Sequence, residues 1–212
     1  MNTLLRMLFF HVLVQFIVKV ILGVHVRHIE RIPREGACVI VANHNSHLDT
    51  MVIMCLLLKQ LNRVQPVAAM DYFLRNKILA WFSLKIIGIL PISRKPTQGK
   101  DVLKPIFEAL KKQNILVLYP EGSRGEPEKF QKLKTGISRI SEQMPHVPIV
   151  PIFFYGLGKA LPKGESLIVP FFCDAYIGEA LFWTGSRTAF MDELQNSFNE
   201  LVKESNNEFY EY

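Results

Sequence analysis

The feature that most constrains the fold of this chain is an apolar run that changes abruptly into polar side chains within residues 38–49. Val39, Ile40 and Val41 are consecutive β-branched residues, which is typical of a strand covered on both faces of a sheet. Functional residues of α/β proteins collect at the carboxyl ends of such strands. We therefore expect the polar residues that follow to form a functional loop, and the apolar spacing beyond them predicts a helix that begins near Ser46.

His44 and Asp49 stand out in this loop because they lie five residues apart at the start of the predicted helix. A carboxylate that holds a histidine fixes its tautomer and stabilises the imidazolium that forms when the ring accepts a proton. The pair is thus a candidate general base with its orienting carboxylate. The alternative is structural, with Asp49 and Ser46 capping the helix and His44 forming ordinary loop hydrogen bonds.

A second apolar strand is predicted at residues 115–118, and it too ends in a polar turn. A glutamate and an arginine on a glycine-rich turn form either a local ion pair of little energetic value or a seat for an anion. The candidate residues of this turn are Glu121, Gly122, Ser123 and Arg124.

Arg94 follows a third short apolar strand within residues 88–94, where, taken alone, it would be an ordinary surface charge. Carboxyl ends of parallel strands meet at one edge of a sheet. We therefore expect His44, Arg94 and Arg124 to lie near one another.

The alternation of strands with amphipathic helices predicts an α/β fold with a mainly parallel, mixed sheet flanked by helices. A chain of 212 residues with 49% apolar composition can bury one substantial core. Pro148 and Pro151 predict an edge or bulged position for the strand at 147–154, because proline cannot donate to a β-ladder. A further short strand is predicted at 167–172.

The charge distribution predicts an anionic partner for the body of the chain. The formal net charge is +6, but residues 188–212 have a balance of −5, which leaves +11 on the rest. Membrane phospholipids and phosphorylated substrates fit this charge, whereas no nucleic-acid recognition motif accompanies it. The odd number of cysteines, all in apolar surroundings, indicates a reducing compartment: Cys38, Cys55 and Cys173.

Residues 1–22 are predicted to form a membrane-associating helix. Its apolar run is long enough to span a bilayer, but polar residues favour an interfacial or shallowly embedded helix in which Arg6 and Lys19 reach the headgroups. A helix packed on the domain is the alternative, and a cleaved signal peptide is disfavoured because no small-residue cleavage site follows. The expected location is the cytoplasmic face of a membrane, as a peripheral or monotopic protein.

Four blocks in a fixed order resemble the glycerophospholipid acyltransferase family, typified by 1-acylglycerol-3-phosphate acyltransferase. Residues 43–49, N-H-N-S-H-L-D, resemble its N-H-x-S-x-x-D block, and residues 88–94 resemble G-x-x-x-I-x-R. Residues 121–124, E-G-S-R, are similar to E-G-T-R, and residues 147–151 are similar to V-P-I-x-P. The resemblance extends over residues 23–180.

This resemblance implies that residues 23–212 form a domain that moves a fatty acyl group from an acyl thioester to the free hydroxyl of a lysophospholipid. The implied reaction converts 1-acylglycerol 3-phosphate to phosphatidate, with acyl-CoA or acyl carrier protein as co-substrate and with no cofactor or metal. It makes His44 the base and Asp49 its orienter. The implied acceptor phosphate site consists of Arg94, Glu121, Gly122, Ser123 and Arg124.

Direct transfer is the simplest chemistry for these residues. Ser46 lacks the G-x-S-x-G elbow of a serine nucleophile, and cysteines in apolar runs disfavour the thiolate. Backbone amides near His44 are candidate oxyanion donors.

Two other functions are compatible with parts of this sequence. A metal-dependent hydrolase could use His44, His47 and Asp49, although H-x-x-H-x-D matches no common zinc pattern. A non-catalytic membrane lipid-binding protein would explain the charge and the first helix but would leave the His44–Asp49 pair without a role.

Overall fold

The computed structural model describes residues 3–93, 101–126, 130–162 and 164–205. Within these residues, seven strands form one sheet in the order β1-β7-β6-β2-β5-β3-β4. Their bounds are β1 (His25–Arg27), β2 (Cys38–Ala42), β3 (Val64–Ala69), β4 (Leu90–Ile92), β5 (Ile115–Leu118), β6 (Ile149–Tyr155) and β7 (Asp174–Ile177). Neighbouring strands are parallel except β6 and β7, so the predicted mainly parallel, mixed sheet is confirmed.

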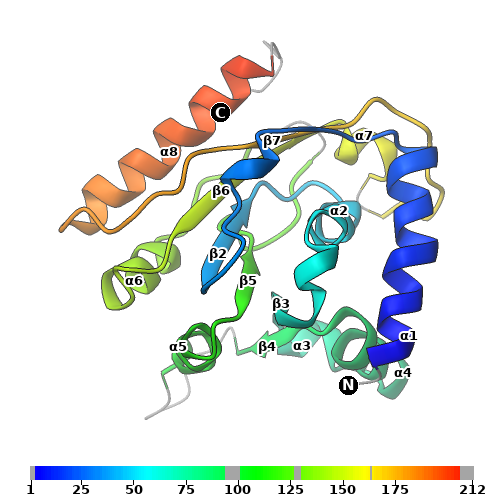
Figure 1. The fold of residues 1–212 in the computed structure, drawn as a ribbon, viewed down its shortest axis with the longest axis horizontal. Helices are drawn as coiled ribbons and strands as arrows, with labels where there is room; N and C mark the ends of the chain where they lie inside the picture. The colour runs from blue at the N-terminus through cyan, green and yellow to red at the C-terminus, as the bar shows by residue number, and fades with distance from the viewer. Residues whose placement is uncertain (1–2, 94–100, 127–129, 163, 206–212) are drawn as a thin grey trace.

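Helices cover both faces of the sheet, as Figure 1 shows. The helices are α1 (Thr3–Leu8), α2 (Leu48–Leu56), α3 (Met70–Phe73), α4 (Lys77–Phe82), α5 (Lys104–Lys111), α6 (Gly136–Gln143), α7 (Leu157–Ala160) and α8 (Arg187–Glu204). Along β2, Ile40 packs into the core beneath α1 and α2, whereas Val39 and Val41 pack into the core beneath α5, α6 and α8. The central strand is therefore buried on both sides, as its unbroken β-branched run predicts.

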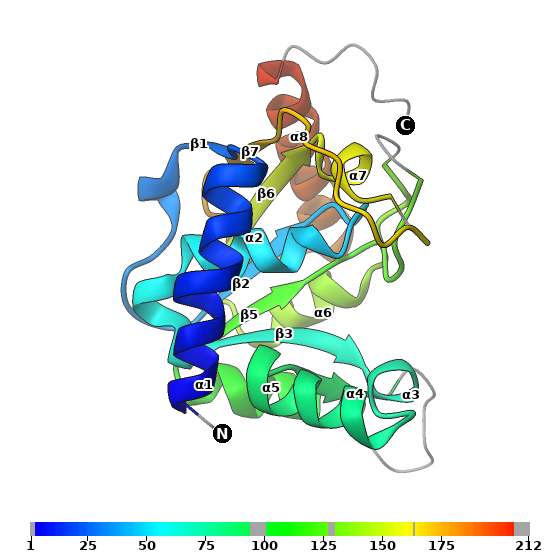
Figure 2. The same ribbon diagram turned by 90° about the vertical axis from the view of Figure 1, so that its right-hand side faces the viewer.

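The first helix continues from α1 through wider π-type turns to Ile21 and stands along one side of the molecule (Figure 2). Phe10, Val14 and Val18 are buried in the core shared with α2. Within the described residues, Leu4–Ile21 is the stretch long and apolar enough to cross a membrane, with a mean hydropathy of 2.0. One face of this stretch thus belongs to the core, and the opposite face is exposed and mainly apolar, with His11 and Lys19 as its exposed polar residues.

Arg6 differs from the sequence prediction. Its side chain is only 1% exposed, and its guanidinium donates hydrogen bonds to Val64 O at 2.9 Å and Ile87 O at 3.1 Å. Burial lowers the pKa of Arg6 to about 10. The expectation that Arg6 reaches lipid headgroups is wrong, because these two carbonyls hold the guanidinium inside the protein.

Of the two alternatives predicted for the strand with Pro148 and Pro151, the edge position is wrong and the bulged position is confirmed, whereas the strand predicted at 167–172 is wrong. The strand β6 lies between β2 and β7 and is therefore not at an edge. On the β7 side, Ile152 of β6 pairs with Ile177, and Ile149 forms a bridge with Leu181. The ladder is interrupted between these two pairs, opposite Pro151. Proline has no backbone N–H to donate, and here it lies where the ladder is interrupted. Residues 167–172 form no strand and run irregularly over the surface.

Candidate active site

Two loops from neighbouring parallel strands meet at one edge of the sheet. Val41 pairs with Leu118, so β2 and β5 end side by side. The loop after β2 and the turn after β5 are then joined directly, because His44 O accepts a hydrogen bond from Gly125 N at 2.8 Å. The structure therefore brings together the two polar segments that the sequence placed after separate strands.

His44 and Asp49 form a hydrogen-bonded pair in this junction. His44 Nδ1 lies 2.9 Å from Asp49 Oδ2, which also accepts from the backbone N–H groups of Asn45 and Ser46 at 2.9 Å each. An oxygen with three such partners acts as an ionised acceptor, so Nδ1 is the protonated nitrogen and Nε2 is free to accept a proton. The Asp49 side chain is 1% exposed, whereas that of His44 is 18% exposed.

The His44 ring is also stacked on Tyr119, a residue that the sequence interpretation did not single out. The ring centroids are 3.9 Å apart and the planes differ by 13°. Tyr119 OH is in turn hydrogen-bonded to Thr50 Oγ1 at 2.8 Å. Burial, and then the charge of Asp49, raises the pKa of Tyr119 well above its ordinary value, so its hydroxyl stays neutral. The position of Tyr119 directly before P-E-G-S-R was the available signal.

Glu121 points inward rather than toward solvent. It is 2% exposed, and its Oε1 accepts from His44 N at 2.8 Å. Burial raises the pKa of Glu121 to about 8, although hydrogen bonds from the backbone of His44 and Gln131 act in the opposite direction. Glu121 therefore orients the backbone of the His44 loop from across the junction.

Asn43 and Ser46 hold the rest of this loop in place. The Asn43 side chain binds both backbone groups of Phe154: Oδ1 accepts from Phe154 N at 2.7 Å, and Nδ2 donates to Phe154 O at 2.9 Å. Ser46 is fully buried and its hydroxyl donates to Leu161 O at 2.9 Å. The amides of His44, Asn45 and Ser46 are all engaged by carboxylates, so these three are not available to an oxyanion.

The predicted phosphate-binding residues lie along the 121–125 turn. Gly122 and Ser123 are exposed, and Arg124 is half-buried. Burial lowers the pKa of His47, and the charges of Arg124 and His44 lower it further, whereas the charge of Asp49 raises it. Arg94 lies outside the described residues.

The described residues contain neither a cluster of metal-ligating side chains nor a lowered thiol pKa at Cys38 or Cys55. Among the residues with described positions, no three His, Cys, Asp or Glu side chains lie together as a metal ion would require. Burial raises the pKa of Cys38 to about 12 and that of Cys55 to about 11, so both remain thiols.

Comparison with known proteins gives a consistent result. The Acyltransferase family model matches residues 23–155. Over 146 residues, 68% of the chain, the sequence is 27% identical to a chloroplastic 1-acyl-sn-glycerol-3-phosphate acyltransferase of Brassica napus and spans 40% of its length. It is 28% identical over 151 residues to the human 1-acyl-sn-glycerol-3-phosphate acyltransferase alpha, covering 70% of this chain and 50% of that one.

The fold also has a counterpart among solved structures. The 1-acyl-sn-glycerophosphate (LPA) acyltransferase PlsC from Thermotoga maritima superposes with a TM-score of 0.68. The match covers 92% of this chain and 78% of that one, at 20% identity.

Proposed function

Because this chain belongs to the acyltransferase family, we propose that it is a membrane-bound enzyme that moves a fatty acyl group from an acyl thioester to the free hydroxyl of a lysophospholipid. The favoured acceptor is 1-acylglycerol 3-phosphate, which appears in the names of its relatives, and the product is phosphatidate. The observation that carries the proposal is the His44–Asp49 hydrogen bond beside the 121–125 turn.

In this proposal, His44 is the general base. Asp49 keeps the proton on Nδ1, so Nε2 removes the proton of the acceptor hydroxyl as its oxygen attacks the thioester carbonyl carbon. The tetrahedral intermediate then breaks its carbon–sulfur bond, and the departing thiolate takes the proton from His44. No covalent enzyme intermediate forms, which agrees with the burial of Ser46 and the high thiol pKa of Cys38 and Cys55. The donor is acyl-CoA or acyl carrier protein, since both present a thioester.

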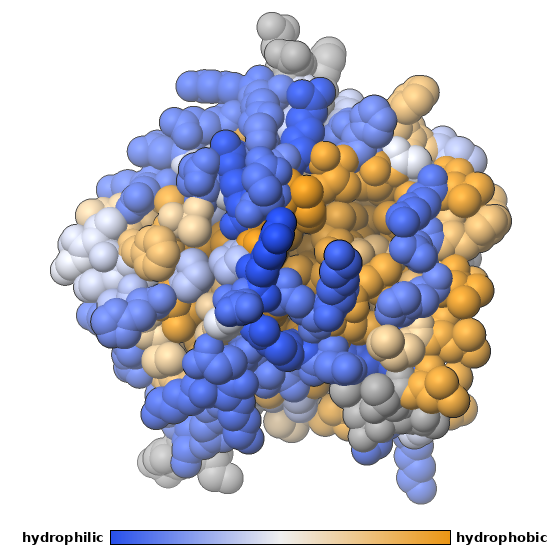
Figure 3. All heavy atoms as spheres, in the orientation of Figure 1, coloured by the Kyte–Doolittle hydropathy of each residue, from blue (hydrophilic) through white to orange (hydrophobic). Residues whose placement is uncertain are grey.

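We further propose that the enzyme lies on the membrane surface, at its cytoplasmic face, rather than across the membrane. The helix up to Ile21 is held by its buried face and by Arg6, so it cannot enter a bilayer along its full length without leaving the core. Its outer face is mainly apolar, although His11 and Lys19 are also exposed there. Figure 3 shows a largely orange surface on this side of the molecule, on the right. The exposed apolar residues of the outer face are Leu4, Leu8, Val12, Leu13, Phe16 and Val20.

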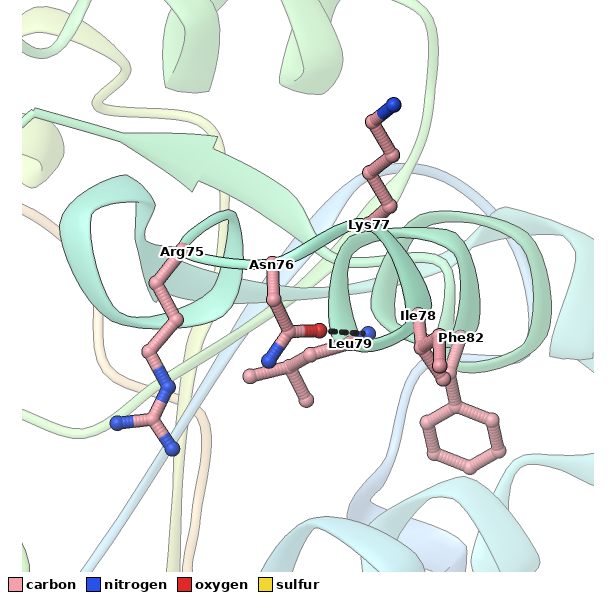
Figure 4. Close-up of a pocket in the computed structure, with 6 residues that line it drawn as sticks. All are labelled: Arg75, Asn76, Lys77, Ile78, Leu79 and Phe82. Atoms are coloured by element: carbon pink, nitrogen blue, oxygen red, sulfur yellow. Dashed lines mark hydrogen bonds between the residues drawn. The ribbon is translucent and has the colours of Figure 1, made fainter.

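A second helix extends this apolar face. Phe82 at the end of α4 packs edge-on against Phe9, with ring centroids 5.5 Å apart, and Ile78 and Trp81 are exposed beside it. A hollow lies along α4, and Figure 4 shows the side chains that line it, with Arg75 and Phe82 on one side of the chain and Lys77 on the other. Apolar side chains edged by cations are suited to the boundary between acyl chains and anionic headgroups.

An acceptor panel tests the proposed function. Full-length protein in mixed vesicles is given one labelled acyl thioester, as its CoA or acyl carrier protein form, with different lysophospholipids and glycerol 3-phosphate. Mass spectrometry should detect phosphatidate in a His44-dependent reaction. Absence of acyl transfer to every acceptor, with hydrolysis or without reaction, would overturn the proposal.

A further inference from the structure

A lysine that none of the four sequence blocks contains lies over the glycine of the 121–125 turn. Gly122 has a φ of +78°, and a Cβ at this position would overlap the ammonium nitrogen of Lys134 and lie 2.9 Å from its Cε. Glycine therefore serves two purposes here. It permits the left-handed backbone and leaves the space in which the Lys134 side chain lies.

The position of Lys134 is fixed by its own segment. Lys134 N donates to Pro120 O at 2.9 Å, which fixes its backbone to the residue directly before the 121–125 turn. Leu133, the residue before it, is 8% exposed and packs in the core beneath α6 and α8. The backbone of residues 131–134 is thus attached to the same turn that is hydrogen-bonded to His44.

We propose that the Lys134 ammonium, together with Arg124, binds the phosphomonoester of the lysophospholipid acceptor. This inference rests on the proposed function, which it deepens by naming a second cation for the acceptor. A lysine supplies a point charge with three donors, and an arginine supplies a planar fork, so the two can share the oxygens of one dianionic phosphate.

The local charges favour an anion at this position. In the described part of the chain, no carboxylate forms an ion pair with Lys134. The nearby Glu121 carries a proton at neutral pH, since burial raises its pKa to about 8, and Asp49 is engaged by His44. Lys134 is exposed, so an incoming headgroup can reach it.

Lys134→Gln, with donor and acceptor concentrations varied separately, tests the inference. The KM for 1-acylglycerol 3-phosphate should rise roughly 10- to 150-fold, as expected for one lost charge-assisted contact. The KM for the donor should not change, and turnover of 1-acylglycerol, which has no phosphate, should be unaffected. Lys134→Arg should recover part of the acceptor affinity. Lys132→Gln is the matched control, because it removes an exposed lysine two residues away.

Two kinetic outcomes would overturn the assignment. A Lys134→Gln enzyme that behaves like Lys132→Gln would show that the ammonium does not contact substrate, and a rise confined to the donor KM would assign Lys134 to the phosphates of the thioester carrier. Failure of the proposed function is recognised separately, by a wild-type protein that acylates no lysophospholipid. In that case, equal binding of 1-acylglycerol 3-phosphate in micelles by wild type and Lys134→Gln would also exclude the site.

Discussion

At the scale of single residues, the arrangement restrains both the direction and the plane of one imidazole ring. The hydrogen bond to Asp49 sets which nitrogen faces the protein, and the stack on Tyr119 sets the tilt of the ring. Thr50 then holds Tyr119 through its hydroxyl. A base whose orientation is fixed before substrate arrives needs less reorganisation in the transition state.

We predict that His44→Ala lowers kcat by at least about 100-fold, the usual contribution of a positioned general base. The variant should still fold, because Asp49 Oδ2 keeps its hydrogen bonds from the backbone of Asn45 and Ser46. Asp49→Asn should lower kcat nearly as far, since the neutral amide cannot fix the Nδ1–H tautomer in the same way. His146→Ala, a substitution of another exposed histidine, serves as the control. Retention of more than about a tenth of wild-type kcat in His44→Ala would mean that another group is the base.

The Tyr119 stack yields a second prediction. Tyr119→Leu should lower kcat by roughly 2- to 10-fold, the value of one aromatic pair, while the KM of each substrate stays the same. Tyr119→Phe and Thr50→Val keep the ring and remove only the hydrogen bond, so their kcat should remain closer to wild type. Urea unfolding of each variant separates lost packing from lost positioning. Equal kcat losses in the Leu and Phe variants would contradict a role for the stacked ring.

At the scale of structural elements, Glu121 connects two loops that lie far apart in sequence. It belongs to the turn after β5, yet its carboxyl binds the backbone of His44, 77 residues earlier. The ordinary pKa of this carboxyl is 4.5, and burial raises it to about 8 in the folded protein. At pH values between 4.5 and about 8, Glu121 therefore binds a proton in the native state that it does not bind in the unfolded chain.

The resulting pH dependence is our third prediction. The free energy of unfolding should fall as the pH rises toward 8, because ionising the buried Glu121 favours the unfolded state, by up to about 1.4 kcal/mol per pH unit. Glu121→Gln keeps an oxygen acceptor for His44 N but cannot ionise, so it should lack this part of the slope. Urea titrations at pH 6 and pH 8 on both proteins measure the difference. Parallel slopes for the two proteins would contradict a protonated native Glu121.

The sequence predicted those features whose pattern lies within a few consecutive residues, and it did not predict those that depend on contacts between distant segments. The ends of β2 and β5 were predicted because an apolar run followed by polar residues is visible in a short window. The central position of β6 was not predictable, because it depends on which strands pair across the sheet and on a ladder break opposite Pro151. Arg6 was misread for the same reason, since its partners Val64 and Ile87 are remote in sequence.

The residues of the candidate site also fall into those that the sequence predicted and those that required the fold. The His44–Asp49 hydrogen bond spans five residues and was predicted directly, and the parallel strands explain why the 121–125 turn lies beside it. Tyr119 and Lys134 required the fold, because a ring stack and a lysine lying over a glycine leave no periodic pattern in sequence. The functional roles of these residues remain predictions that the substitutions above test.

At the scale of the whole molecule, the apolar outer surface formed by the first helix and α4 is separate from the residues proposed to carry out chemistry. The first helix is fixed to the core by Phe10, Val14 and Val18, so substitutions on its outer face need not disturb the fold. The proposed membrane binding and the proposed acyl transfer can therefore be separated by experiment. Long-chain lysophospholipids reside in the membrane, whereas short-chain acceptors are dispersed in water.

The last prediction uses this separation. Changing Leu13 and Phe16 to serine, or Ile78 and Trp81 to serine, should weaken vesicle binding on the order of 10- to 100-fold, because each exposed apolar side chain contributes about 1.5 to 3 kcal/mol when fully buried and these would be partly buried. Turnover of long-chain acceptor in vesicles should fall in parallel, while turnover of a dispersed short-chain acceptor should stay at the wild-type level. Val14→Ser on the buried face is the contrasting variant, since it should lower the free energy of unfolding. Vesicle flotation, urea unfolding and the two assays together decide the matter. If both surface variants float with vesicles as the wild type does, the apolar face does not contact the membrane. If they lose turnover of the short-chain acceptor, the apolar face supports the active site instead.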